Sequence, residues 1–230
     1  MITDLLVSQQ LIQSKLVTDF SRFSGRLGIL GGTFDPVHRM HLGISYDLLG
    51  SVVDNVIFVP AAQNPLKTTR PTADTDRLAM LLLAVEQISH FFVSDIELKR
   101  GVPSYTVDTF RQLRLLVNPD VELVLIIGSD CLLQLSSWRD IENLFVLARV
   151  VVVQRSEERS LEQWHVEIAA LPLSAAARQK IKDNFQLREA NQVSSTLIRG
   201  ASDLGFCLNN VPDAVAQYIL SRGLYGLIAK

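Results

Sequence analysis

Short apolar runs separated by helical stretches constrain the fold of this chain more than any other feature of its sequence. The runs span residues 27–30, 56–59, 91–93, 123–127 and 150–153. They are bounded by Gly, Pro or polar residues, as is typical of strands buried on both faces of a sheet. Strands that alternate with helices favour a parallel sheet joined by right-handed crossovers. The sequence therefore predicts an α/β doubly wound parallel sheet with helices on both faces, where ligands bind beyond the carboxyl ends of the strands.

Helices are predicted between these runs from apolar periodicity and from capping residues. For example, Ser104 or Thr106 caps a helix that carries Val107, Phe110 and Leu113 on one face. The predicted helices span about 39–49, 75–88, 106–117, 175–183, 195–203 and 212–221.

The first 24 residues are interpreted as an N-terminal extension. Apolar residues recur there at roughly helical spacing, and the run Ser21 to Gly25 interrupts the pattern. We therefore predict a helical extension over 1–24 and one domain over 25–230. The extension packs either on the body of the domain or on a second subunit, so a homo-oligomer remains an open alternative.

Composition excludes several classes of function. Hydrophobic residues make up 48% and charged residues 20% of the chain, which is typical of a globular protein with a sizeable core. The formal net charge is −2, whereas proteins that bind nucleic acid usually carry a basic excess. The sequence shows neither a secretory signal nor the run of about 20 apolar residues that a membrane span needs. We expect a cytoplasmic protein without nucleic-acid or membrane partners.

The junction after the first predicted strand is the strongest candidate site. Gly31 and Gly32 allow the backbone to approach a ligand closely. His38 and His41 are three residues apart at a helix start, so both rings can lie on one face and add donors to the positive end of the helix dipole. This arrangement favours phosphate. A metal is a weaker alternative, because no third His or Cys lies nearby, and we predict no protein-bound metal.

Later segments offer further donors. Ser194, Ser195 and Thr196 begin a helix and Arg199 follows within one turn, which gives either a second phosphate cradle or an ordinary capped helix with a surface arginine. Asp130 follows a buried strand, where it either accepts hydrogen bonds from ribose hydroxyls or caps a helix.

The segment from Gly31 to His41 resembles the signature of the HxGH nucleotidyltransferases. Later segments resemble, in the same order, those of the nicotinate-nucleotide adenylyltransferases, and the resemblance covers about residues 26 to 226. These segments are Asp95 to Arg100, Pro103 to Thr109, Ile127 to Asp130 followed by Trp138, and Val193 to Arg199.

The resemblance implies a Rossmann-like nucleotidyltransferase fold and transfer of the adenylyl group of ATP to nicotinate mononucleotide, with Mg²⁺ accompanying ATP. It assigns catalysis to His38, His41 and Arg199. The residues that it assigns to ATP are Gly31, Gly32, Thr33, Phe34, Gly128, Asp130, Ser194, Ser195 and Thr196. Those that it assigns to nicotinate mononucleotide are Lys67, Ser104, Tyr105, Thr106 and Trp138.

The chain departs from the family pattern at two places. Met40 stands where the family has Gly, so its side chain is expected either to crowd the adenosine or to pack against the adenine. The run Asn64 to Lys67 replaces a Pro-Pro-His-Lys loop, and so loses a polar contact while it keeps the cation. Pantetheine-phosphate adenylyltransferases and cytidylyltransferases are less similar, because they lack the Ser-Tyr-Thr segment and Trp138. Met40 supports one further alternative, a degenerate paralogue that binds nucleotide without efficient turnover.

Overall fold

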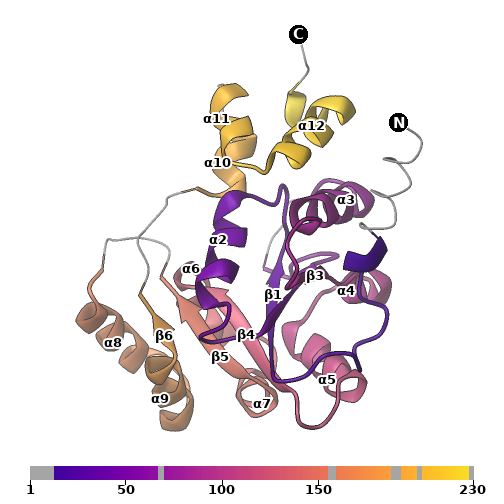
Figure 1. Cartoon of the computed structure of the whole chain (residues 1–230). Helices are drawn as coiled ribbons and strands as arrows, with labels where there is room; N and C mark the ends of the chain where they lie inside the picture. The colour runs from indigo at the N-terminus through magenta and orange to yellow at the C-terminus, as the bar shows by residue number, and fades with distance from the viewer. Residues whose placement is uncertain (1–12, 67–69, 155–158, 188–192, 201–203, 228–230) are drawn as a thin grey trace.

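The computed structural model describes residues 13–66, 70–154, 159–187, 193–200 and 204–227 (Figure 1). These residues form an all-parallel sheet with the strand order β3-β2-β1-β4-β5-β6, which confirms the predicted doubly wound fold. The strands are β1 (Arg26–Gly32), β2 (Asn55–Pro60), β3 (Phe91–Val93), β4 (Glu122–Gly128), β5 (Arg149–Val153) and β6 (Phe185–Gln186).

Helices connect successive strands and follow the last one. Those between β1 and β4 are α2 (Arg39–Leu48), α3 (Asp74–Val85), α4 (Ile96–Arg100) and α5 (Thr106–Leu116). Beyond β4 lie α6 (Ser129–Leu132), α7 (Ile141–Leu147), α8 (Leu161–Ala170), α9 (Ala175–Asp183), α10 (Ser195–Gly200), α11 (Leu204–Asn209) and α12 (Asp213–Arg222), with 3-10 turns η1 (Leu135–Ser137) and η2 (Leu224–Gly226). None of the helices within the described ranges has both the length and the hydropathy of a membrane span.

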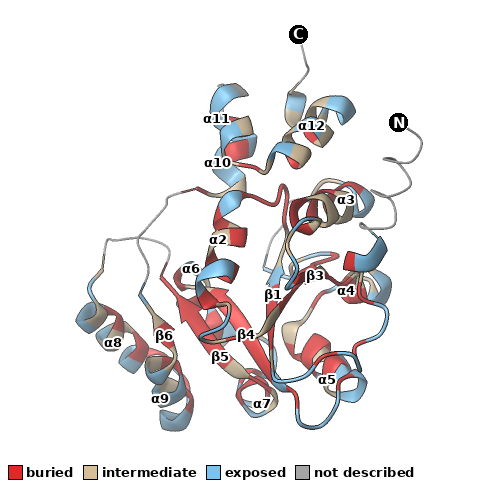
Figure 2. Ribbon diagram, viewed as in Figure 1, coloured by how far each residue is buried: buried red, intermediate tan, exposed pale blue. Residues whose placement is uncertain are grey.

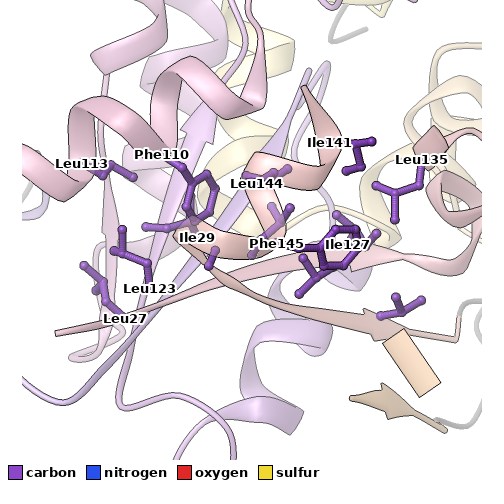
Figure 3. Close-up of a cluster of buried hydrophobic side chains, with 14 of the residues drawn as sticks. Leu27, Ile29, Phe110, Leu113, Leu123, Ile127, Leu135, Ile141, Leu144 and Phe145 are labelled. Carbon is purple, nitrogen blue, oxygen red and sulfur yellow. The ribbon is translucent and has the colours of Figure 1, made fainter. Parts of the chain in front are cut away.

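The sheet separates two hydrophobic clusters because side chains alternate across each strand. On β1, Leu27 and Ile29 belong to the cluster that is covered by α5, α7, α8 and α9, part of which is shown in Figure 3. Leu30 belongs to the opposite cluster, which is covered by α2, α3 and α12. The strands between them are buried throughout their central residues (Figure 2). This burial on both faces explains why the strands are continuous apolar runs.

The chain before β1 covers the free edge of the sheet. Leu16 pairs in parallel with Val93 of the edge strand β3, and the Val17 N–H donates to the Val93 carbonyl over 2.8 Å. Phe20 and Phe23 are buried in the α5-side cluster. Much of the predicted N-terminal helix, over 1–12, lies outside the described residues, and from Leu16 onward the segment is not helical. Its described part belongs to the body of the domain.

Candidate active site

The candidate site lies where the strand order reverses. β1 and β4 are neighbours, with Leu30 beside Ile126, yet their crossovers leave in opposite directions along the sheet. Their carboxyl ends, Gly32 and Gly128, therefore open onto the crevice in which doubly wound folds bind ligands. The two glycine-containing junctions predicted to bind ATP meet at this crevice.

Gly31 and Gly32 differ in what surrounds them. A Cβ atom at Gly31 would meet no heavy atom within 4 Å, so the backbone there faces open space. A Cβ atom at Gly32 would come within 3.0 Å of the Phe34 ring. A side chain at Gly32 would therefore require the Phe34 ring to shift by a few tenths of an ångström, whereas Gly31 leaves room that a ligand can use.

The Phe34 ring packs under the loop that follows β1. Its φ angle of 49° lies in the left-handed region, and its ring is buried. The ring meets the imidazole of His41 edge-on, with centroids 4.9 Å apart, and also contacts Phe58. Because the whole residue is 1% exposed, Phe34 packs behind the loop, and its contact with ATP stays a prediction.

His38 and His41 lie against each other at the start of α2, as their spacing predicts. Their rings stack with centroids 3.7 Å apart. The His38 N–H donates to His41 Nδ1 over 3.3 Å, so a neutral His41 carries its proton on Nε2. His38 is 1% exposed, whereas His41 is half-buried. His41 is therefore the more accessible of the two donors.

Met40 faces the protein interior. Its side chain is 3% exposed and belongs to the cluster on the α2 face, together with Val37 and Ile198. A side chain so covered has little surface to offer an adenine ring. The expectation that Met40 crowds or stacks on adenosine is therefore wrong for this conformation, because α2 turns that position toward the core.

The segment 193–200 docks on the loop after β1, which brings the two predicted phosphate cradles together. Ser195 Oγ donates to the Pro36 carbonyl over 2.9 Å, and Arg199 Nη1 donates to the Asp35 carbonyl. Ser194 Oγ accepts from the Leu197 N–H over 3.2 Å and so caps α10. Thr196 is exposed beside Arg199. Residues more than 150 positions apart in the sequence thus line one edge of the crevice.

Asp35 connects several segments around this edge, a role that was not predicted from the motif. Its buried carboxylate accepts from the Tyr225 hydroxyl over 2.7 Å and from the Thr72 N–H over 3.2 Å. Arg199 lies 3.9 Å from the same carboxylate. Burial, followed by the Asp35 contact, raises the pKa of Tyr225 far above its usual range, so the hydroxyl keeps its proton and remains a donor.

Arg77 is a second residue that sequence reasoning missed. It is fully buried although it is charged, and it donates to the carbonyls of Thr33 (2.7 Å) and Thr72 (3.0 Å). It also pairs with Asp74 within α3. Arg77 therefore fixes the loop after β1 to the start of α3. A charged residue inside the apolar 75–88 stretch was the one available signal.

The β4 junction places Gly128 at the strand end and Asp130 on the surface of α6. Asp130 is exposed there, on the same edge of the sheet as the loop after β1. Its position permits a contact with a ligand in the crevice, and the contact with ribose stays a prediction.

The predicted mononucleotide residues lie near the ends of β2 and β4. Ser104 is buried, and its groups join two loops: Oγ accepts from the Ala62 N–H over 3.0 Å, and its N–H donates to the Gln63 carbonyl over 3.1 Å. Tyr105 packs under Arg139, whose guanidinium carbon lies 4.7 Å from the ring centroid. Ser104 therefore shapes this region, while Tyr105 is the more accessible side chain.

The rest of this group is described in part. Thr106 begins α5, and Trp138 follows η1, half-buried against the α5-side cluster. Lys67 lies outside the described residues. A hollow of about 520 Å³ opens beside Ala62 and Gln63, which are the partners of Ser104.

Glu97 contacts the first turns of α5. Its buried carboxylate accepts from Thr109 Oγ1 over 2.5 Å and lies 3.9 Å from Arg100. Burial raises the pKa of Glu97, while the hydroxyls of Thr109 and Ser104 and the charge of Arg100 oppose the shift. Glu97 thus helps to hold the loop that carries the predicted nicotinate donors.

Known proteins match most of the chain. Residues 29–201 match the cytidylyltransferase-like family model. A probable nicotinate-nucleotide adenylyltransferase of Gemmatimonas aurantiaca is 35% identical to this chain, over 87% of this chain and 92% of that protein. One of Streptomyces coelicolor is 38% identical, over 85% of this chain and 98% of that protein. The structure of Plasmodium falciparum nicotinic acid mononucleotide adenylyltransferase in complex with NaAD superposes with a TM-score of 0.67 at 17% identity, over 88% of this chain and 98% of that one, and so supports the fold.

Proposed function

Because the chain belongs to the nicotinate-nucleotide adenylyltransferases, within the cytidylyltransferase-like family, we propose that it transfers the adenylyl group of ATP to nicotinate mononucleotide. The products are nicotinate adenine dinucleotide and pyrophosphate, which places the reaction in NAD biosynthesis.

One observation carries this proposal. The loop after β1 and the start of α10 meet at the crevice of the sheet, joined by Ser195 to Pro36 and by Arg199 to Asp35. The accessible donors at this meeting point are His41, Thr196 and Arg199. Donors that converge from two helix starts suit a polyphosphate.

The ATP roles follow from what each group can reach. Gly31 would let a phosphate approach the backbone, and His41 Nε2–H would donate toward the α-phosphoryl oxygens. His38 is 1% exposed and stacks on His41, so it would act mainly by holding that ring in place. Arg199 is partly exposed, and a guanidinium has five donors, so its contacts with Asp35 and Thr196 leave donors for the β and γ groups. Gly128 and Asp130 would contact the ribose of ATP.

The mononucleotide roles fall on the region between β2 and α5. The N–H groups and hydroxyls at the α5 start, in Tyr105 and Thr106, would meet the nicotinate carboxylate, and Trp138 would offer its face to the pyridine ring. Ser104 would act by shaping this loop, since its own polar groups bond to Ala62 and Gln63. Lys67 would supply a cation to the same substrate.

The chemistry needs positioning and charge stabilisation more than covalent catalysis. An oxygen of the mononucleotide phosphate attacks the α-phosphorus in line, and the bond from that phosphorus to the bridging oxygen of pyrophosphate breaks. No general base is needed, because a phosphate monoester has a second pKa of about 6 and is largely ionised near neutral pH. His38, His41 and Arg199 would stabilise the charge that develops on the phosphoryl oxygens.

Mg²⁺ would enter with ATP, since Mg²⁺ is commonly held by substrate phosphates and water. Within the ranges that the structure describes, there is no group of three or more His, Cys, Asp or Glu side chains that could hold a metal ion. When bound, the ion neutralises charge on the departing pyrophosphate.

The alternative of a degenerate paralogue without efficient turnover rested on Met40. Its side chain is buried in the cluster on the α2 face, so the alternative gains no support from that residue.

An assay of pyrophosphate release distinguishes these possibilities. Purified protein is supplied with ATP, Mg²⁺ and either nicotinate or nicotinamide mononucleotide. We expect release with both, with kcat/KM at least about 10-fold higher for the acid, because charge-assisted hydrogen bonds exceed neutral ones by about 1.5 kcal/mol. Tight ATP binding without release with either mononucleotide would favour the degenerate paralogue.

A further inference from the structure

The C-terminal turn η2 reaches back to the loop after β1 through one side chain. The hydroxyl of Tyr225 donates to Asp35 Oδ1 over 2.7 Å. Tyr225 lies 190 residues after Asp35 and outside every motif that suggested the function. The contact therefore links the end of the described chain directly to the candidate ATP site.

The two carboxylate oxygens of Asp35 have different partners. Oδ1 accepts from Tyr225, and Oδ2 accepts from the Thr72 N–H and lies 3.9 Å from Arg199 Nη1. The same Arg199 nitrogen donates to the Asp35 carbonyl. Asp35 is 5% exposed, so water supplies little of what its carboxylate needs.

The hydrogen bond from Tyr225 determines how strongly the Asp35 carboxylate attracts Arg199. A buried carboxylate that loses a neutral donor leaves an acceptor unsatisfied, and the nearest charged donor then becomes more attractive. For Asp35 that donor is Arg199, the predicted partner of the ATP phosphates. Removal of the Tyr225 hydroxyl would therefore draw Arg199 toward Asp35 and away from ATP.

The backbone of Tyr225 indicates that the side chain matters at this position. Its φ of 57° and ψ of 22° lie in the left-handed region, which glycine adopts at lower cost. Gly223 and Gly226, on either side, also have positive φ angles. Tyr225 is thus a non-glycine residue with a strained backbone between two glycines. Its ring points inward, with the hydroxyl 3.9 Å from Met80 Sδ.

We propose that Tyr225 is a positioning residue for adenylyl transfer, which acts through Asp35 to leave Arg199 available to the phosphates of ATP. This inference rests on the proposed function. It assigns to the C-terminal turn a role in ATP affinity that is separate from its role in packing.

Tyr218 provides a matched control. Its hydroxyl donates to Asp76 Oδ1 over 2.8 Å and joins α12 to α3, and Arg222 lies 3.4 Å from the same carboxylate oxygen. This contact repeats the tyrosine, carboxylate and arginine chemistry in the same C-terminal region. The Asp76 carboxylate has no bond to the loop after β1 among the contacts of the described residues.

The test compares Tyr225→Phe with Tyr218→Phe in the full chain. Melting temperature, kcat, and KM for ATP and for nicotinate mononucleotide are measured for both variants. We expect Tyr225→Phe to raise the KM for ATP about 3- to 10-fold, a fraction of the factor that a hydrogen bond to a charged group can carry, and to leave the KM for the mononucleotide within about 2-fold. Tyr218→Phe should lower the melting temperature with KM for ATP within about 2-fold of wild type. Equal KM values for ATP in the two variants would overturn the proposal.

A double-mutant cycle tests the route through Arg199. The ATP dissociation constant is measured for wild type, Tyr225→Phe, Arg199→Ala and the double variant. If Tyr225 acts through Arg199, Tyr225→Phe has no further effect once Arg199 is alanine, whereas an undiminished effect refutes this route. Because ATP binding is read directly, a wild-type protein that binds ATP but releases no pyrophosphate would contradict the proposed function and still test Tyr225. A wild-type protein that does not bind ATP would overturn both.

Discussion

Replacing Met40 with glycine restores the family motif and should nevertheless harm this protein. The Met40 side chain is 3% exposed in the cluster on the α2 face, so Met40→Gly removes a buried side chain in the first turn of α2. Truncation of a buried Met to Ala costs about 2–5 kcal/mol, and glycine adds up to about 1 kcal/mol in a helix. We therefore expect a loss of about 2–6 kcal/mol in unfolding free energy.

Urea denaturation and ATP titration, performed on the same preparations, check this expectation. Met40→Leu is the control, because a volume-conserving apolar change usually costs less than about 1.5 kcal/mol. The ATP dissociation constant of the folded Met40→Gly protein should stay within about 3-fold of wild type or become weaker, since the side chain faces the core. A Met40→Gly variant with unchanged stability and more than about 10-fold tighter ATP binding would refute this reasoning and show that Met40 obstructs the site.

Three further predictions concern the glycines, His41 and Glu97. Gly31→Ala should keep wild-type stability but weaken ATP binding, whereas Gly32→Ala should lower stability through contact with the Phe34 ring. Denaturation and ATP titration check both variants. A destabilised Gly31→Ala together with a Gly32→Ala of wild-type stability would contradict the assigned geometry. His41→Ala should lower kcat about 10²- to 10³-fold, the range for loss of one preorganised donor, and near-normal turnover of folded protein would remove His41 from the mechanism. Burial raises the pKa of Glu97, so between neutral pH and 4.5 the folded protein binds a proton there more readily than the unfolded chain does. The stability of wild type relative to Glu97→Gln should therefore rise as pH falls from neutral toward 4.5. A stability difference that stays constant over this range in urea denaturation would argue against the raised pKa.

The parts of the fold that were predictable from the sequence depend on local signals. The β1 strand, the glycines and the start of α2 are contiguous, and the 3-residue spacing of His38 and His41 determines that the rings share a face. β6 escaped prediction because two residues, Phe185 and Gln186, show no periodicity. The pairing of Leu16 with Val93 depends on a free sheet edge that exists only once the strands have been ordered.

The site residues that were missed depend on contacts between distant segments. Arg77 reads as a surface charge, and its burial follows from carbonyls of Thr33 and Thr72 that the fold brings to it. Tyr225 sits in a turn whose only local signal is the glycine on each side. The side chain of Met40 was misjudged for the same reason: the motif gives its position along α2, while the tertiary packing decides which way it points.

The fate of the α-phosphorus of ATP tests the central claim most directly. Protein is incubated with ATP labelled at the α-phosphorus, Mg²⁺ and saturating nicotinate mononucleotide, and the products are separated. We predict that the label appears in nicotinate adenine dinucleotide, in a one-to-one ratio with the pyrophosphate released. Label recovered as AMP, or retained in ATP while the mononucleotide stays unchanged, would contradict adenylyl transfer by this chain.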